Sequence, residues 1–250
     1  MENVLVQVRV RRYRHRMRNH GGPGHHWNQA EAASIRDELA DSYRRLRSTT
    51  DGRTDAGSAR IRGVLDSTLR SVEAVAPMWL TENCTDLLRG EVPVPTDGDD
   101  LPALGHRGLV LLEKSLSLTI LGTAGPQGLA PIDGLLWWPA SVVGEELIDD
   151  DEAPQMLMVH VLSEETTALT SPWPPSIWAD ARLTDLGMFA LPLGVEFAPP
   201  TEAADDLAPA IELLLGLGAA LRDGRLIFEA IGGETRSGPA PRTVAVVVPT

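Results

Sequence analysis

Cysteine and lysine are almost absent from this 250-residue chain, and long apolar runs are absent altogether. Cys84 is the sole cysteine, which excludes an intrachain disulfide and a thiolate metal cluster. Lys114 is the sole lysine and follows no glycine, which excludes a phosphate-binding loop of the P-loop type. No apolar run approaches the length of a membrane span, and the N-terminal run is too short for a signal-peptide core. These absences predict a cytoplasmic protein with no membrane partner.

Arginine therefore supplies every basic residue except one, in a chain rich in Ala, Gly, Pro and Leu. That usage is typical of a GC-rich bacterial genome or of its mobile elements. The formal net charge is −13, but it is unevenly distributed. Residues 1–20 hold six arginines and one acid, a balance of +5, whereas the remainder holds 16 basic and 34 acidic residues, a balance of −18. The sequence thus pairs a basic N-terminal arm with an acidic body.

The basic arm, VRVRRYRHRMR, is the strongest chemical signal in the sequence. Arginine makes forked contacts with phosphate and stacks on bases, and tyrosine offers a further stacking face. We therefore predict a contact with nucleic acid or with an acidic protein surface, made by Arg9, Arg11, Arg12, Tyr13, Arg14, Arg16 and Arg18. The alternative is an arm that folds onto the acidic body of its own chain, for example onto the run Glu145–Glu152.

A second cluster near the N-terminus consists of four of the six histidines. Histidines on a loop, completed by an acidic residue, could bind zinc, although their spacing matches no compact zinc signature. A metal-assisted hydrolase with these ligands is the alternative function, and its residues would be His15, His20, His25 and His26. No cofactor other than this zinc is expected.

The motif HGGPG at His20–Gly24 is similar to the oxyanion loop of α/β-hydrolases. Those enzymes also need a nucleophile elbow, G-x-S-x-G, and no serine of this chain has glycines in both of those places. We therefore interpret HGGPG as a tight turn between the arm and the first helix. No catalytic residue is predicted, and a binding role is favoured over an enzymatic one.

Two tryptophan–proline segments, WWP and SPWPPSIW, are the third feature. Such segments form either a partner surface or a rigid apolar cover over a sheet. If they form a partner surface, the chain would be a structural or assembly protein that binds its partner through Trp137, Trp138, Trp173 and Trp178. The oligomeric state cannot be inferred from these residues.

Periodicity predicts an α+β fold with a single mixed β-sheet, an N-terminal layer of two to three helices and a C-terminal helix. Alternating valines predict a strand over 4–10, and Asn28 with Glu31 forms a capping box before a helix. The expected helices cover about 29–47, 56–76, 79–89 and 206–222. The expected later strands lie in GLVLLEKSL, IDGLLWW, MLMVHVL, MFALPLGVEF and RTVAVVV.

Several other features have ordinary structural interpretations. The acidic runs Glu145–Glu152 and Asp97–Asp100 lack the ligand pattern of a calcium loop and are predicted to be solvated loops. His160 lies in an apolar strand and is interpreted as a hydrogen-bonded core histidine. The chain is predicted to be one domain over 1–250, with a sub-boundary in the turn-rich linker 91–104 between a strand-plus-helix part and a β-rich part at 105–250.

The segment from Met78 to Pro139 resembles a group of actinobacterial proteins of unknown function. The resemblance is carried by MWLTENCTDLL, DLPALGHRGLVLLEKSL and APIDGLLWWP. It implies a bacterial cytoplasmic protein with a shared fold. It implies no activity and supplies no catalytic residue.

Overall fold

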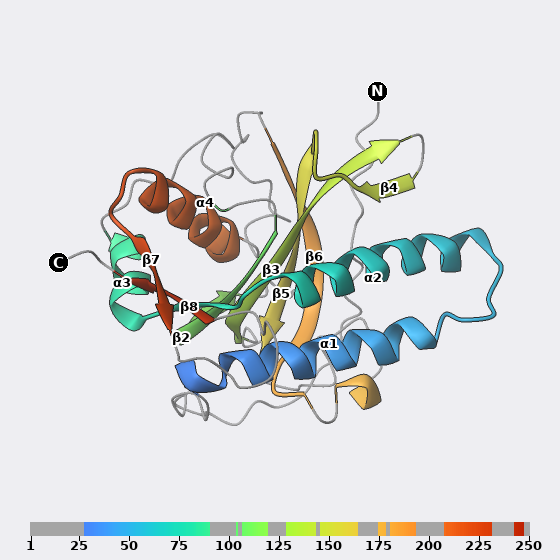
Figure 1. Cartoon of the computed structure of the whole chain (residues 1–250), viewed down its shortest axis with the longest axis horizontal. Helices are drawn as coiled ribbons and strands as arrows, with labels where there is room; N and C mark the ends of the chain where they lie inside the picture. Colours follow the sequence, from blue (N-terminus) through green and yellow to red (C-terminus); the bar gives the residue numbers. More distant parts are fainter. Residues whose placement is uncertain are drawn as a thin grey trace.

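The structure is a computed structural model that describes residues 28–90, 104, 107–119, 129–143, 146–164, 175–178, 181–193, 208–231 and 243–247. Within these residues, helices pack on one mixed β-sheet, so the predicted α+β fold is confirmed (Figure 1). The helices are α1 (Ala32–Ser48), α2 (Ala56–Ala74), α3 (Glu82–Gly90) and α4 (Ala208–Arg222). The strands are β1 (Met78–Leu80), β2 (Gly108–Thr119), β3 (Leu129–Val143), β4 (Glu146–Asp149), β5 (Met156–Ser163), β6 (Thr184–Pro192), β7 (Ile227–Ile231) and β8 (Thr243–Val247).

The sheet has eight strands in the order β6-β5-β3-β2-β1-β8-β7, and β4 forms a hairpin with β3 beside this path. β1 pairs in parallel with both β2 and β8, whereas the other pairs are antiparallel. The sheet is mixed because α3 lies between β1 and β2 in the chain and allows these two strands to run parallel, whereas the pairs among the strands from β2 to β6 are antiparallel. β5 lies between β3 and β6 and is buried on both faces, as its apolar sequence predicts.

Alternate residues of each central strand face two different helical layers. On β2, Val110 and Leu112 belong to the core beneath α3 and α4, and Leu109 and Leu111 belong to the core beneath α1 and α2. The two helical pairs therefore cover opposite faces of the sheet. Figure 1 shows α1 and α2 side by side over one end of the sheet, with α4 and α3 near β7 at the other.

The first helical layer forms where its cap and its apolar stripe predict it. Asn28 and Glu31 make the expected capping box, at a short 3-10 turn over Gln29–Glu31 that continues into α1. Ile35, Leu39 and Tyr43 are buried along the predicted stripe. α2 begins at an aspartate cap, Asp55, whose carboxylate accepts from the backbone N–H of Ser58.

The predicted helix over 79–89 is wrong at its start. Met78–Leu80 is a strand in the interior of the sheet, and the helix begins at Glu82. Leu80 points into the core beneath α3 and α4 while Trp79 points into the other core, an alternation that only a strand gives to adjacent residues. A three-residue apolar run has no periodicity that distinguishes strand from helix.

Other parts of the sequence interpretation lie outside the described residues. These are the N-terminal strand over 4–10 and nearly all of the linker 91–104. The division into domains therefore stays a prediction. The structure also contains β7 at Ile227–Ile231, a strand that is not among those expected from the sequence. No helix in the described part of the chain is both long enough and apolar enough to cross a bilayer.

Glycine at position 134 is required by the close approach of β2 and β3. A Cβ added to Gly134 would lie 2.7 Å from the backbone oxygen of Val110, whereas a Cβ at Gly63 on α2 would meet nothing within 4 Å. We expect Gly134→Ala to lower the free energy of unfolding by about 1–3 kcal/mol. Gly63→Ala is the control and should raise it by about 0.5–1 kcal/mol. Urea unfolding of both variants measures this; equal effects at the two positions would contradict the described β2–β3 spacing.

Candidate functional site

A hydrogen-bonded cluster of buried polar side chains joins the α1–α2 layer to the sheet. The His160 ring lies at its centre, with Nδ1 3.0 Å from Asp185 Oδ2 and Nε2 3.1 Å from Thr68 Oγ1. The Tyr43 hydroxyl donates to the same Asp185 Oδ2 at 3.0 Å. Trp138 Nε1 lies 3.4 Å from His160 Nε2. These five residues come from α1, α2, β3, β5 and β6, and we refer to them as the polar cluster.

Strand alternation aims His160 at the helices. Met158, His160 and Leu162 share one face of β5, and Leu162 belongs to the core beneath α1 and α2. The neighbouring strand delivers Asp185 through a β-bulge, at which the pairing shifts from Leu162–Asp185 to Val161–Gly187. Gly187 has a φ of 138°, a conformation that favours glycine, and its N–H donates to Asp185 Oδ1 at 2.8 Å. The extra residue places Asp185 on the face that His160 occupies.

All members of the polar cluster are buried. Tyr43, Thr68 and Trp138 are fully buried, and Asp185 and His160 expose 1% and 2% of their surface. Burial acts to raise the pKa of the Asp185 carboxyl, but the His160 ring and hydrogen bonds from His160, Gly187 and Tyr43 bring that pKa below its ordinary value. Burial, together with the negative charge of Asp185, raises the pKa of Tyr43 well above its ordinary value. Asp185 is thus a buried anion held by several donors.

The order hydroxyl, imidazole, carboxylate is also the order of groups in a nucleophilic catalytic triad. Two observations separate the polar cluster from such a site. The Thr68 hydroxyl donates to the Val64 carbonyl oxygen one helical turn earlier, at 2.8 Å, and its side chain is inside the core. A substrate has no route to the Thr68 oxygen in this conformation. The arrangement therefore fixes α1 and α2 against the sheet, and the interpretation of His160 as a hydrogen-bonded core histidine is confirmed.

A second group of polar contacts ties the β3–β4 hairpin to α2. Arg107 donates to Asp149 at 2.5 Å, to Asp151 at 2.7 Å and to the Ser71 hydroxyl at 2.9 Å. Arg70 on α2 also donates to Asp149, at 2.6 Å. Burial acts to lower the pKa of Arg107, and the two carboxylates outweigh it and raise that pKa. The ion pair between Arg107 and Asp149 is mostly buried, and Ser71 and the more exposed Arg70 connect it to α2.

The prediction of solvated loops for Glu145–Glu152 is therefore wrong in part. Glu146–Asp149 forms β4, and the Asp149 side chain is only 8% exposed because it accepts from two arginines. The next residue, Asp150, accepts from the backbone N–H groups of Glu152 and Ala153 and closes the turn. The sequence EELIDDDE does not reveal these roles, because its only apolar residues are the pair Leu147 and Ile148, which is too short to show a strand period. The acidic run Asp97–Asp100 lies outside the described residues.

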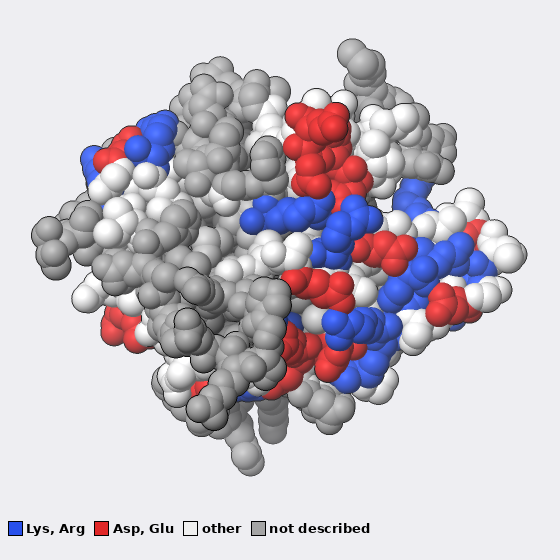
Figure 2. Space-filling view, in the orientation of Figure 1, with Lys and Arg blue, Asp and Glu red and all other residues white. Residues whose placement is uncertain are grey.

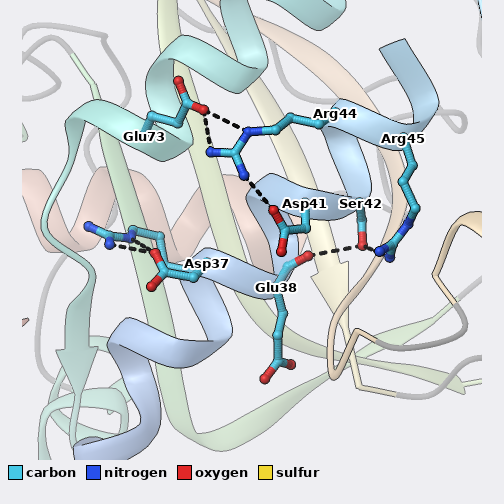
Figure 3. A network of polar contacts seen from close by, with 8 residues as sticks. Asp37, Glu38, Asp41, Ser42, Arg44, Arg45 and Glu73 are labelled. Carbon is cyan, nitrogen blue, oxygen red and sulfur yellow. Dashed lines mark hydrogen bonds and ion pairs between the residues drawn. The ribbon is translucent and has the colours of Figure 1, made fainter. Parts of the chain in front are cut away.

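The outer surface of the helical layer carries both signs of charge. Arg44 on α1 bridges Asp41 on the same helix and Glu73 on α2, at 2.5 Å from Glu73 (Figure 3). Arg47 contacts Asp51 and Asp66 in the same manner, at 2.5 and 2.6 Å. Figure 2 shows basic and acidic side chains interleaved over α1 and α2. Such exposed pairs contribute little stability each, and together they leave no block of one sign.

The connection before β6 is fixed to α1 by Arg182. Its guanidinium donates to Glu38 at 2.6 Å, to Glu31 at 2.7 Å and to the Ser34 hydroxyl at 2.8 Å. The hydrogen bond from Arg182 lowers the pKa of Glu38 against the opposing effect of burial. These contacts lie just before Asp185 and hold its strand beside Tyr43. The same segment is held by Arg45, which donates to the Ile177 carbonyl oxygen at 2.8 Å.

Three of the four tryptophans predicted to form a partner surface lie in the interior instead. Trp137, Trp138 and Trp178 are fully buried, so these three side chains form no exposed surface in this chain. Trp178 packs edge-on against Tyr43 at 5.4 Å, and Trp138 belongs to the polar cluster. Their bulk is used to fill both cores of the sheet, which is the apolar-cover interpretation. Trp173 lies outside the described residues.

The predicted arm and the histidine cluster lie in residues 1–27, outside the described residues. The arm residues are Arg9, Arg11, Arg12, Tyr13, Arg14, Arg16 and Arg18, and the predicted zinc ligands are His15, His20, His25 and His26. Both assignments stay predictions. Within the described ranges, no three His, Cys, Asp or Glu side chains come close enough together to hold a metal ion.

Sequence reasoning did not find Asp185 or Thr68. A signal for Asp185 was present, since an aspartate inside an otherwise apolar strand must pair with a donor. Thr68 carried no such signal because it lies among polar residues of an amphipathic helix. Comparisons with protein-family models, with curated protein sequences and with solved structures found no match to this chain.

Removal of the buried charge is the first test of the polar cluster. We expect Asp185→Asn to lower the free energy of unfolding by about 3–5 kcal/mol near neutral pH, since it breaks a buried charged network. Because the pKa of Asp185 is lowered in the folded chain, its contribution is present above pH ~4 and is lost as the pH falls below that value. Urea unfolding from neutral to acid pH should show a smaller acid-induced loss in the variant. An unchanged acid dependence would contradict the assignment.

Tyr43→Phe tests the contact from α1 with little change in packing. The variant leaves Asp185 with one donor fewer, at an expected cost of about 1–3 kcal/mol. Because the pKa of Tyr43 is raised in the folded chain, its stabilisation is present below pH ~10 and is lost as the pH rises above that value. Unfolding at alkaline pH should therefore cost the variant less additional stability than it costs the wild type. An identical alkaline limb in both proteins would show that Tyr43 ionises without hindrance.

Proposed function

We propose that this chain is a non-enzymatic binding protein of a GC-rich bacterium or its mobile elements. In this proposal it acts in the cytoplasm and contacts nucleic acid through Arg9–Arg18 and Tyr13 of the N-terminal arm. The main support for this proposal is the uneven distribution of charge along the sequence. Six arginines stand among the first 20 residues with one acid, whereas the remaining chain has a balance of −18. A cationic block of this kind is the electrostatic footprint of a phosphate-binding segment.

The helical surface supports the assignment of anion binding to the arm. Three arginines of α1 are paired with carboxylates of the same helical layer: Arg36 with Asp37, Arg44 with Glu73 and Arg47 with Asp66. A phosphate backbone brought to this surface would meet acids at the same density as arginines (Figure 2). The described helices therefore offer no basic footprint, and the arm is the better candidate.

The β3–β4 hairpin supports binding in trans rather than folding of the arm onto its own body. The acidic run Glu145–Glu152 was the expected docking place in cis. Asp149 and Asp151 in that run already accept from Arg107, and Asp150 already accepts from two backbone N–H groups. An arm that docked on Asp149 would have to displace its buried partner Arg107. Phosphate offers it an anion without that cost.

Nucleic acid is favoured over an acidic protein surface by the composition of the arm. Tyr13 and His15 stand between arginines, and aromatic rings interleaved with guanidinium groups provide stacking faces for bases. An acidic protein would use the charges but not the interleaved rings. Arginine is also the basic side chain that best forks onto phosphate.

A salt titration of binding is the experiment that tests this function. The full chain is titrated into a labelled single strand and a labelled duplex while the salt concentration is raised from about 50 to about 300 mM. If all six arginines meet phosphate, the logarithm of affinity should fall against the logarithm of salt with a slope of about −5. The triple variant with Arg12, Arg14 and Arg16 changed to Gln should reduce that slope by about 3.

The matched control changes three exposed arginines of the body, Arg53, Arg60 and Arg225, to Gln. It alters the net charge by the same amount and should leave the slope within about one of the wild-type value. Equal losses in the two triple variants would mean that net charge alone is responsible. No binding to either nucleic acid at the lowest salt, or binding indifferent to salt, would overturn the nucleic-acid proposal.

A further inference from the structure

The β3–β4 hairpin has an open edge. β4 pairs with β3, and within the described residues no strand lies on its other side. Because the backbone N–H of Asp150 donates to the Pro139 carbonyl oxygen, every second residue back along β4 also turns its backbone toward β3. The backbone N–H and C=O groups of Leu147 and Asp149 therefore point away from the sheet, where a further strand can form hydrogen bonds with them.

The same hairpin exposes apolar side chains. Three of the five large apolar side chains that are exposed in the described part of the chain lie here, with 44% of Val142, 61% of Val143 and 38% of Ile148 exposed. Leu147 and Asp149 contact α2 through Val64 and Arg70, so Ile148 and Val143 lie on the face of the hairpin that points away from α2. An open edge with exposed β-branched side chains is a surface that pairs with another strand, and folded proteins usually cover it.

The two strands at the ends of the sheet are less suited to a basic partner strand. β6 contains the bulge at Gly187 and ends in Pro192, and a bulge and a proline both obstruct pairing along an edge. β7 lies in the stretch 222–231, which holds two arginines and two acids and so carries no net charge. Neither edge therefore combines free backbone groups with a charge that would attract arginine.

The end of β4 does carry such a charge. Residues 149–152 bring four carboxylates, and the arginines that contact them in the described structure are Arg70 and Arg107. Four negative and two positive charges leave a balance of −2 at this end of the hairpin, with every internal ion pair kept. A basic strand is therefore attracted to the edge of β4 without displacing Arg107.

The chain itself contains a segment that fits this edge. Residues 4–10, which lie outside the described residues, alternate valine with Leu5, Gln7 and Arg9 and lead into the arginines of the arm. A single strand is not stable alone in water and needs a sheet to pair with. The connection from Val10 to Asn28 spans up to about 55–60 Å. That length exceeds the diameter of a compact 250-residue chain, about 45–50 Å, so the segment can reach the hairpin.

We propose that residues 4–10 pair with the outer edge of β4 as a further strand of the sheet. The valine side of this strand continues the apolar face of Val143 and Ile148, and its other side carries Arg9 on the face of Asp149. The contact uses the backbone edge of β4, so it differs from docking of the arginines on the acidic run and leaves the Arg107–Asp149 pair intact. It is independent of the function proposed for the arm, since residues 11–18 lie beyond the paired segment.

Hydrogen exchange of two backbone amides in the full chain, without nucleic acid, tests this pairing. The amides of Leu147 and Asp149 should be protected in the wild type. In the double variant Val6→Pro, Gln7→Pro they should exchange at least about tenfold faster, because adjacent prolines remove a donor whichever side of the segment faces β4. The matched control, Val6→Ile with Gln7→Thr, keeps strand propensity and should keep the protection. The Ile148 amide, which faces β3, should stay protected in all three proteins.

Three outcomes would overturn the proposal. The first is rapid exchange of both amides in the wild type, and the second is equal protection in the wild type and the proline variant. The third is protection that grows when the protein concentration is raised about tenfold, since a second copy would then cover the edge. The proline variant keeps every arginine, so its salt titration with nucleic acid reports separately on the function proposed for the arm.

Discussion

A buried carboxylate constrains the architecture of this chain more than any other single group. Asp185 is 1% exposed and negatively charged, so the fold must bring donors to it. Those donors come from the backbone of Gly187, from Tyr43 on α1 and from His160 on β5. Tyr43 thus ties α1 directly to Asp185, and Thr68 ties α2 to the His160 ring, so both helices are positioned over the sheet by this group of contacts. The polar cluster therefore specifies how the layer docks, while the surrounding apolar side chains supply most of the favourable burial.

The same layer is held at its margins by arginines. Arg182 fixes the start of β6 to α1, and Arg107 fixes the β3–β4 hairpin to α2. Their acceptors are carboxylates of the acidic body, which are thereby occupied within the chain. The segment in which basic residues outnumber acidic ones is the N-terminal arm. The proposed binding function rests on this difference between a body whose charges are paired with one another and an arm rich in arginine.

The periodicity of the sequence predicted much of the fold because long elements leave repeated signals. The cap at Asn28 and the stripe through Tyr43 identified α1, and the apolar run at 156–162 identified an interior strand. The prediction of a helix at Met78–Leu80 was wrong because three residues are too few to show a period. Strand β7 was not predicted because its segment has no clear alternation of apolar and polar residues. Short strands acquire their conformation from neighbours in the sheet, here β2 and β8, that are distant in sequence.

The candidate site was less predictable than the fold. His160 was recognised as a hydrogen-bonded core residue, but its partners on α2 and β6 are 92 and 25 residues away. The bulge that aims Asp185 inward depends on a pairing shift that no local pattern reveals. The positions of the tryptophans were also not predictable from the sequence, because aromatic side chains are equally suited to an exposed binding surface and to a buried core.

The claim that this cluster docks the helical layer is tested most directly by a double-mutant cycle across the layer boundary. The free energies of unfolding of the wild type, Tyr43→Phe, Asp185→Asn and the double variant give the coupling energy between the α1 hydroxyl and the β6 carboxylate. A contact of 3.0 Å to a buried charge predicts a coupling of about 1–3 kcal/mol. A coupling below about 0.5 kcal/mol, with additive losses from the two single variants, would contradict the account.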